Sequence, residues 1–107
     1  MATIKAVIVD PDGTVRATEI EESLGSYQAV VGGYIEGVLG SEATMYVNEE
    51  GLLQGLPPNP VATQFAQSIL RRNVLLVGTA LILGPPDNEG NDTPVRPTVV
   101  GYLTKEN

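Results

Sequence analysis

The side chains available for chemistry in this chain are carboxylates, hydroxyls, four tyrosines and six basic residues, because it contains neither histidine nor cysteine. Histidine is the usual general base near neutral pH and the commonest metal ligand. A chain without cysteine also has no disulfide, no thiolate metal site and no cysteine nucleophile. Most hydrolase and metalloenzyme mechanisms are therefore excluded. We expect a protein that is not an enzyme and has no catalytic residues, no metal and no cofactor.

The densest group of reactive residues is the carboxylate pair Asp10 and Asp12, which follows an apolar run. Residues 7–14 are VIVDPDGT, and this segment resembles the first motif of haloacid-dehalogenase-type phosphatases. The resemblance implies that the first Asp attacks phosphorus and the second acts as acid and base beside magnesium. The rest of that pattern is missing, because the only lysines are Lys5 and Lys105 and no acidic pair follows a later strand. A β-hairpin turn explains the motif better than a magnesium-dependent phosphatase does.

The same carboxylates do not fit a calcium-binding loop. An EF-hand loop requires glycine at its sixth position and a bidentate Glu at its twelfth. Counted from Asp10, the twelfth residue is Glu21, but the sixth is Val15, and the fifth, where Asp or Asn is expected, is Thr14. The sequence therefore predicts no metal site here.

Two glycine-containing segments are the candidates for binding a ligand. Residues 32–36 (GGYIE) would let a ligand lie against flat backbone, with the tyrosine stacking on it. Residues 48–51 (NEEG) would place two carboxylates in a tight turn. A structural interpretation competes with both, because glycine also ends helices and adjacent carboxylates in a turn are usually solvated. The candidate ligand-binding residues are Gly32, Gly33, Tyr34, Glu36, Asn48, Glu49, Glu50 and Asn59.

The length and charge of the chain restrict its class. The 107 residues correspond to one domain, residues 1–107, with a single modest core. Thirteen acidic residues against six basic ones give a formal net charge of −7, which disfavours binding to nucleic acid or to an anionic membrane. The start of the sequence has no cationic lead or cleavage site, and no stretch approaches membrane-spanning length. We expect a cytoplasmic protein whose partners include neither nucleic acid nor membrane.

The first half of the chain predicts a hairpin, a helix and two further strands. Residues 4–10 form an apolar, β-branched run and residues 14–20 alternate in polarity, so the Pro-Asp-Gly turn between them predicts a β-hairpin. Ser23 is placed to cap a helix that ends at two glycines. Strands are predicted over residues 34–39 and 43–47.

The second half predicts a helix, a strand, a long loop and one closing strand. Asn59 and Pro60 are suited to the N-cap and first residue of a helix over residues 61–72. Residues 74–83 are the most apolar stretch and predict a central strand, residues 84–97 a mobile contact loop, and residues 98–103 a last strand. The order is β-β-α-β-β-α-β, an α+β fold with a mostly antiparallel sheet and two helices packed on it. The apolar central strand must be covered on both faces, so we expect a homodimer.

Four segments together resemble one protein family over nearly the whole chain. They are IKAVIVDPDGTV at residues 4–15, VGGYIEGV at 31–38, YVNEEGLLQGLPPNPVAT at 46–63 and VGTALILGPPDNEGNDTP at 77–94. They are similar to the family catalogued as domain of unknown function 3846, small proteins of actinobacteria, firmicutes and their phages and plasmids. The resemblance implies a genetic context but no mechanism.

Three functions follow as expectations. The first is a non-enzymatic accessory protein of a phage or mobile element, which binds a host protein or assembles with itself in the host-cell cytoplasm. The alternative is a module that binds or sequesters a small ligand, and the third is the phosphatase. A concave site separates the first two, because a small ligand must be largely buried whereas a protein partner can bind a flat surface.

Overall fold

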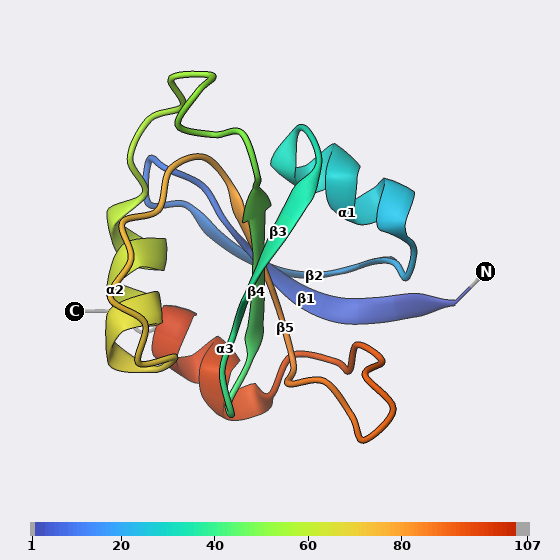
Figure 1. Ribbon diagram of the computed structural model, residues 1–107. Coiled ribbons are helices and arrows are strands. Elements are labelled where there is room, and N and C mark those ends of the chain that lie inside the picture. The colour runs from blue at the N-terminus through green and yellow to red at the C-terminus, as the bar shows by residue number, and fades with distance from the viewer. Residues whose placement is uncertain (1, 105–107) are drawn as a thin grey trace.

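The computed structural model describes residues 2–104. This part of the chain forms five strands and three helices in the order β-β-α-β-β-α-β-α (Figure 1). The elements are β1 (Thr3–Val9), β2 (Val15–Glu21), α1 (Leu24–Val31), β3 (Ile35–Leu39), β4 (Thr44–Asn48), α2 (Pro60–Ser68), β5 (Ala80–Leu83) and α3 (Pro97–Thr104). The predicted α+β class is therefore confirmed, with a third helix in addition to the two expected.

All five strands belong to one sheet in the order β2-β1-β5-β4-β3, and every neighbouring pair is antiparallel. The predicted hairpin is confirmed, since β1 pairs with β2 from Thr3 opposite Glu21 to Val9 opposite Val15. Gly13 takes the left-handed φ of 94° that this turn requires. Strands β2 and β3 form the two edges of the sheet, each paired on one side only.

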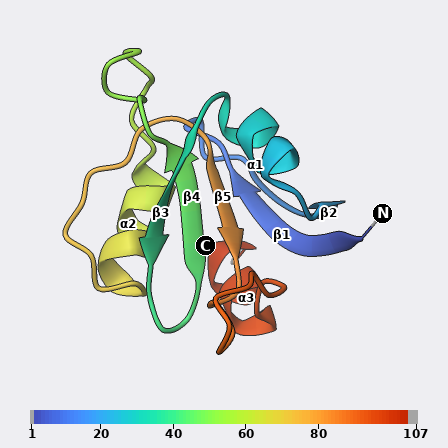
Figure 2. The same ribbon diagram turned by 45° about the vertical axis from the view of Figure 1, so that its right-hand side comes forward.

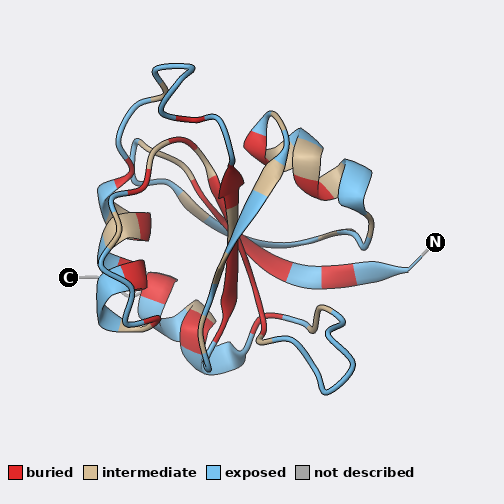
Figure 3. Ribbon diagram, viewed as in Figure 1, coloured by how far each residue is buried: buried red, intermediate tan, exposed pale blue. Residues whose placement is uncertain are grey.

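Helices cover both faces of the sheet (Figures 1 and 2). Helix α1 lies on one face, where Tyr27 and Val31 pack with the alternate β1 residues that face it. Helices α2 and α3 lie on the other face and contribute Phe65 and Val99, among others, to the larger core cluster. Figure 3 shows the buried residues concentrated along the middle strands and on the inner sides of the helices. None of the helices in residues 2–104 is long and apolar enough to cross a bilayer.

The closing strand expected over residues 98–103 is wrong, because this segment is helix α3. Its β-branched residues favoured a strand, but Val99 and Leu103 are four residues apart and both are buried. That spacing places them on one side of a helix. Pro97 begins the helix, where its missing N–H costs nothing.

Two other predicted elements are shorter than expected. Strand β5 contains only the last four residues of the predicted 74–83 strand. Before it, Gly78 has a φ of 77° and its N–H donates to the Pro57 carbonyl, so this stretch contacts the proline-rich corner instead of the sheet. Helix α2 ends at Ser68, and Arg71 follows it with a positive φ of 58°.

The strand that motivated the expected homodimer is covered within one chain. Ala80 and Ile82 face the α2–α3 core cluster, whereas Leu81 and Leu83 face the α1 cluster. That argument for self-association therefore no longer applies, and a homodimer stays an untested prediction.

The 84–97 loop is attached to the sheet at its base. The Gly84 N–H donates to the Thr93 carbonyl at 2.9 Å, and the Val95 N–H donates to the Lys5 carbonyl at 2.9 Å. Val95 itself is buried, as its apolar side chain predicted. The mobility of the loop tip in solution stays a prediction.

Candidate functional site

The two glycine-containing segments of the sequence lie side by side. The Glu49 N–H donates to the Tyr34 carbonyl at 2.8 Å, directly beyond the pair formed by Ile35 and Asn48. A Cβ atom at Gly33 would lie 3.0 Å from the amide nitrogen of Asn48. The Asn48 side chain therefore lies directly against the backbone of Gly33, where a larger residue would crowd it.

Asn48 holds this junction together and is itself buried. Its Nδ2 donates to the Val31 carbonyl at 3.4 Å and to Gln54 Oε1 at 3.2 Å. Its Oδ1 accepts a hydrogen bond of 2.8 Å from the Glu50 N–H. The donors and acceptor of the side chain are thus occupied by the protein, which gives Asn48 a structural role.

Asn59 is the second buried asparagine among the candidates, at 0% exposure. Its Nδ2 donates to the carbonyls of Val9 and Gly78 at 3.0 and 2.9 Å. Its Oδ1 accepts from the Ala62 N–H at 3.1 Å as the N-cap of α2. Both amide hydrogens are used, so this side chain connects the end of β1, the stretch before β5 and the start of α2.

The remaining candidates have separate surroundings. Gly32 is the C-cap of α1 with a left-handed φ of 83°, as the structural interpretation expected. Tyr34 is 66% exposed, and Glu36, Glu49 and Glu50 are also exposed. None of the eight candidates lines the groove between β2 and α3 or the cavity between α1 and the 84–97 loop.

The carboxylates of the DPDGT motif are used by the hairpin. Asp12 accepts a hydrogen bond of 2.9 Å from the Thr14 N–H, and this bond holds the pKa of its carboxyl below its usual value. Asp10 accepts from the Thr79 hydroxyl at 3.1 Å and lies 3.6 Å from Arg16. Within residues 2–104, no group of three or more acidic, histidine or cysteine side chains is placed to hold a metal. Lys105, one of the two lysines, lies outside the described residues.

We predict that the protein does not hydrolyse phosphate esters. The reason is that Asp12 is bonded within the turn and Asp10 to the Thr79 hydroxyl, with no further acidic ligand grouped around them in the described part of the chain. The measurement is turnover of p-nitrophenyl phosphate with magnesium, for the wild type and Asp10→Asn. Turnover that Asp10→Asn abolishes would contradict the prediction and restore the phosphatase.

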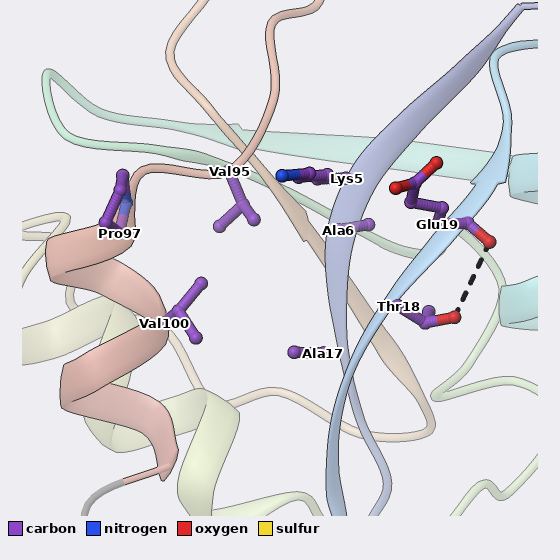
Figure 4. Close-up of a pocket in the computed structure, with 8 residues that line it drawn as sticks. All are labelled: Lys5, Ala6, Ala17, Thr18, Glu19, Val95, Pro97 and Val100. Atoms are coloured by element: carbon purple, nitrogen blue, oxygen red, sulfur yellow. Dashed lines mark hydrogen bonds between the residues drawn. The ribbon is translucent and has the colours of Figure 1, made fainter.

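A groove opens between helix α3 and the strands β1 and β2 (Figure 4). Its volume is about 560 Å³, which lies in the range of known ligand cavities. The strands supply one wall, and Val95 with the start of α3 supplies the other. The lining residues are Lys5, Ala6, Ala17, Thr18, Glu19, Val95, Pro97 and Val100.

The groove combines an apolar surface with two opposite charges. Ala17, Val95 and Val100 supply methyl groups, and Lys5 and Glu19 are direct partners on the antiparallel β1–β2 pair. Glu19 also accepts a hydrogen bond of 3.0 Å from the Thr3 hydroxyl. Figure 4 shows Lys5 extending toward Val95 across the top of this opening. Such a surface suits a ligand with an apolar group and polar or charged groups beside it.

The sequence did not reveal this groove, because its walls come from segments 76 to 95 residues apart in the chain. One partial indication was present. The sequence predicts the long 84–97 loop as a contact site, and Val95 of this loop lines the groove.

A family model described as Domain of unknown function (DUF3846) matches residues 4–106. The match covers nearly the whole chain, as the resemblance of its four segments implied, and the chain belongs to this family. No curated protein and no solved structure matches the chain.

Proposed function

We propose that this member of the family is a non-enzymatic binding module that takes an extended segment of a protein partner in the groove between β2 and α3. The observation that carries the proposal is the position of the groove beside the free edge of β2. An extended segment placed there makes main-chain hydrogen bonds to the edge strand, while its alternate side chains enter the groove.

The length of the edge supports this mode of binding. All seven residues of β2 pair with β1, and the other side of the strand has no neighbour in the described sheet. Unpaired backbone groups along such an edge are a template for another chain. Five of the seven β2 residues are exposed, so a chain laid along this edge has open surface beside it.

Charge defines the chemistry of the proposed partner. Glu19 and Glu21 lie on the same face of β2 as Ala17, because side chains alternate along a strand. The whole chain carries a formal charge of −7. A segment with apolar residues for the groove and basic residues for these carboxylates is therefore the best complement.

Groove-filling substitutions test the proposal. Peptides are selected from a displayed random library against the wild type, and their affinities are measured for Val100→Lys and Ala17→Lys. Each lysine occupies the groove and repels a basic segment, so we expect affinity to fall at least tenfold, about 1.4 kcal/mol. Gly101→Lys is the matched control, because it places the same charge on α3 where a side chain meets nothing within 4 Å.

The outcome is decisive in either direction. Selected peptides that alternate apolar and basic residues and lose affinity only for Val100→Lys and Ala17→Lys support the proposal. Peptides that bind all three variants equally well contradict it. Ala17 is exposed, so Ala17→Lys keeps the test informative if the half-buried Val100 tolerates lysine poorly.

We infer that the partner is a host protein and that this chain serves a phage or mobile element as an accessory protein. The support is the family resemblance and the features of a binding module. Assembly with a second copy through the same edge is the related possibility, and light scattering at micromolar concentration distinguishes it by mass.

A further inference from the structure

A second cavity lies on the opposite face of the sheet, between the start of α1, the strands β3 and β4, and the 84–97 loop. Its volume is about 330 Å³, which is large enough for a small organic molecule. The lining residues are Glu22, Ser23, Leu24, Tyr27, Ile35, Tyr46, Gly90, Asn91 and Asp92.

Two stacked tyrosines and one aspartate define the polar side of this cavity. The rings of Tyr27 and Tyr46 are 5.6 Å apart between centroids and nearly parallel, at 20°. The Tyr46 hydroxyl donates to Asp92 Oδ1 at 2.8 Å. Tyr27 is 4% exposed, yet its hydroxyl has no hydrogen-bond partner among the described residues. Buried polar groups are nearly always paired, so an unpaired hydroxyl in a cavity wall indicates a place for a polar ligand.

The electrostatics of the cavity are negative. Burial, followed by the nearby charges of Asp92 and Glu22, raises the pKa of Tyr27 to about 12. Burial and the hydrogen bond to Asp92 also raise the pKa of Tyr46. None of the nine lining residues is a lysine or arginine, so nothing in the wall neutralises the two carboxylates.

An organic cation fits this wall better than a metal ion. The described residues contain no group of three acidic, histidine or cysteine side chains placed to hold a metal. Leu24 and Ile35 supply apolar surface beside the carboxylates. A molecule with both a charged nitrogen and a hydrocarbon body matches both parts of the cavity.

We propose that this cavity binds a small alkylammonium ion. Its N–H groups donate to the carboxylates of Glu22 and Asp92 and to the hydroxyl oxygen of Tyr27, and its hydrocarbon chain lies against Leu24 and Ile35. This site is separate from the groove at β2, which lies on the other face of the sheet, so either proposal can fail without the other.

The probe for the test is n-butylammonium, with butanoate of the same chain length as the matched control. In an NMR titration, we expect the cation to cause saturable changes in the backbone amide chemical shifts of residues 22–27 and 90–92. Added salt should weaken this binding, and the anion should cause no such changes. Glu22→Gln and Asp92→Asn each remove a charge-assisted hydrogen bond and should weaken binding about tenfold. Glu89→Gln changes the same charge in the same loop outside the cavity and should leave binding unchanged.

Tyr27→Phe separates a ligand contact from a merely structural residue. Removal of an unpaired buried hydroxyl should leave the midpoint of urea unfolding unchanged or raise it, while binding of n-butylammonium weakens severalfold. Any of three results would overturn the proposal: no saturable shift up to tens of millimolar, equal binding by Tyr27→Phe and both charge variants, or tighter binding of magnesium or calcium at the same residues.

Discussion

Asn59→Ala is expected to reduce the free energy of unfolding by about 3 kcal/mol, because it leaves two carbonyls and one N–H without partners. The affected groups are the carbonyls of Val9 and Gly78 and the N–H of Ala62, all bonded to a side chain that is 0% exposed. In thermal unfolding, the loss corresponds to a fall in Tm of roughly 15 °C. The measurement is urea unfolding of the variant and the wild type. An equal dependence of the unfolding free energy on urea concentration shows that both proteins unfold between the same two states.

Two further variants show whether the bonds to the carbonyls are responsible. Asn59→Ser keeps an N-cap oxygen but cannot donate to both carbonyls, so it should recover only the smaller N-cap part, about 1 kcal/mol. Asn73→Ala removes an exposed asparagine and should change stability by less than about 0.5 kcal/mol. Wild-type stability in Asn59→Ser would contradict the structural role given to the side chain.

Gly84→Ala is expected to destabilise the protein by about 2–3 kcal/mol through overpacking at the base of the 84–97 loop. An added Cβ would overlap the Pro94 carbonyl and the Thr93 hydroxyl. The Thr93 hydroxyl already donates to the Pro85 carbonyl at 2.6 Å, so it has little freedom to move away. The displaced loop would also shift Asp92 and Val95, one in each cavity.

Gly101→Ala is the matched control for this substitution. A Cβ at position 101 meets nothing within 4 Å, and alanine favours a helix over glycine by about 0.5–1 kcal/mol. Urea unfolding should therefore show a stabilised control beside a destabilised Gly84→Ala. Equal stability of the two variants would show that the loop base adapts and that its geometry does not depend on glycine.

Local chemistry made much of the fold predictable. The Ser23 and Asn59 caps hold the starts of α1 and α2 as their side chains indicated, and the Pro-Asp-Gly turn joins β1 and β2. These features depend on a few neighbouring residues. Helix α3 was missed because Val99 and Val100 favour a strand locally, while burial of Val99 and Leu103 against the sheet decides in favour of a helix.

The candidate site was less predictable, for a physical reason. The two segments are conspicuous in sequence because of their glycines, and the structure places Gly33 against the Asn48 side chain. Their contacts serve the junction of β3 and β4. The two cavities instead combine ordinary residues, such as Ala17 with Val100 and Tyr27 with Asp92, which only the pairing of distant segments brings together.

Amide hydrogen exchange of β2, measured with and without a selected peptide, shows whether an extended segment pairs with the free edge of Val15–Glu21 beside the groove. Backbone amides along an unpaired edge exchange quickly, and hydrogen bonds to an added strand protect them. We expect alternate amides of β2 to become protected in the complex and to remain unprotected in Ala17→Lys. Unchanged exchange along β2, with protection gained elsewhere on the molecule, would contradict binding at this edge.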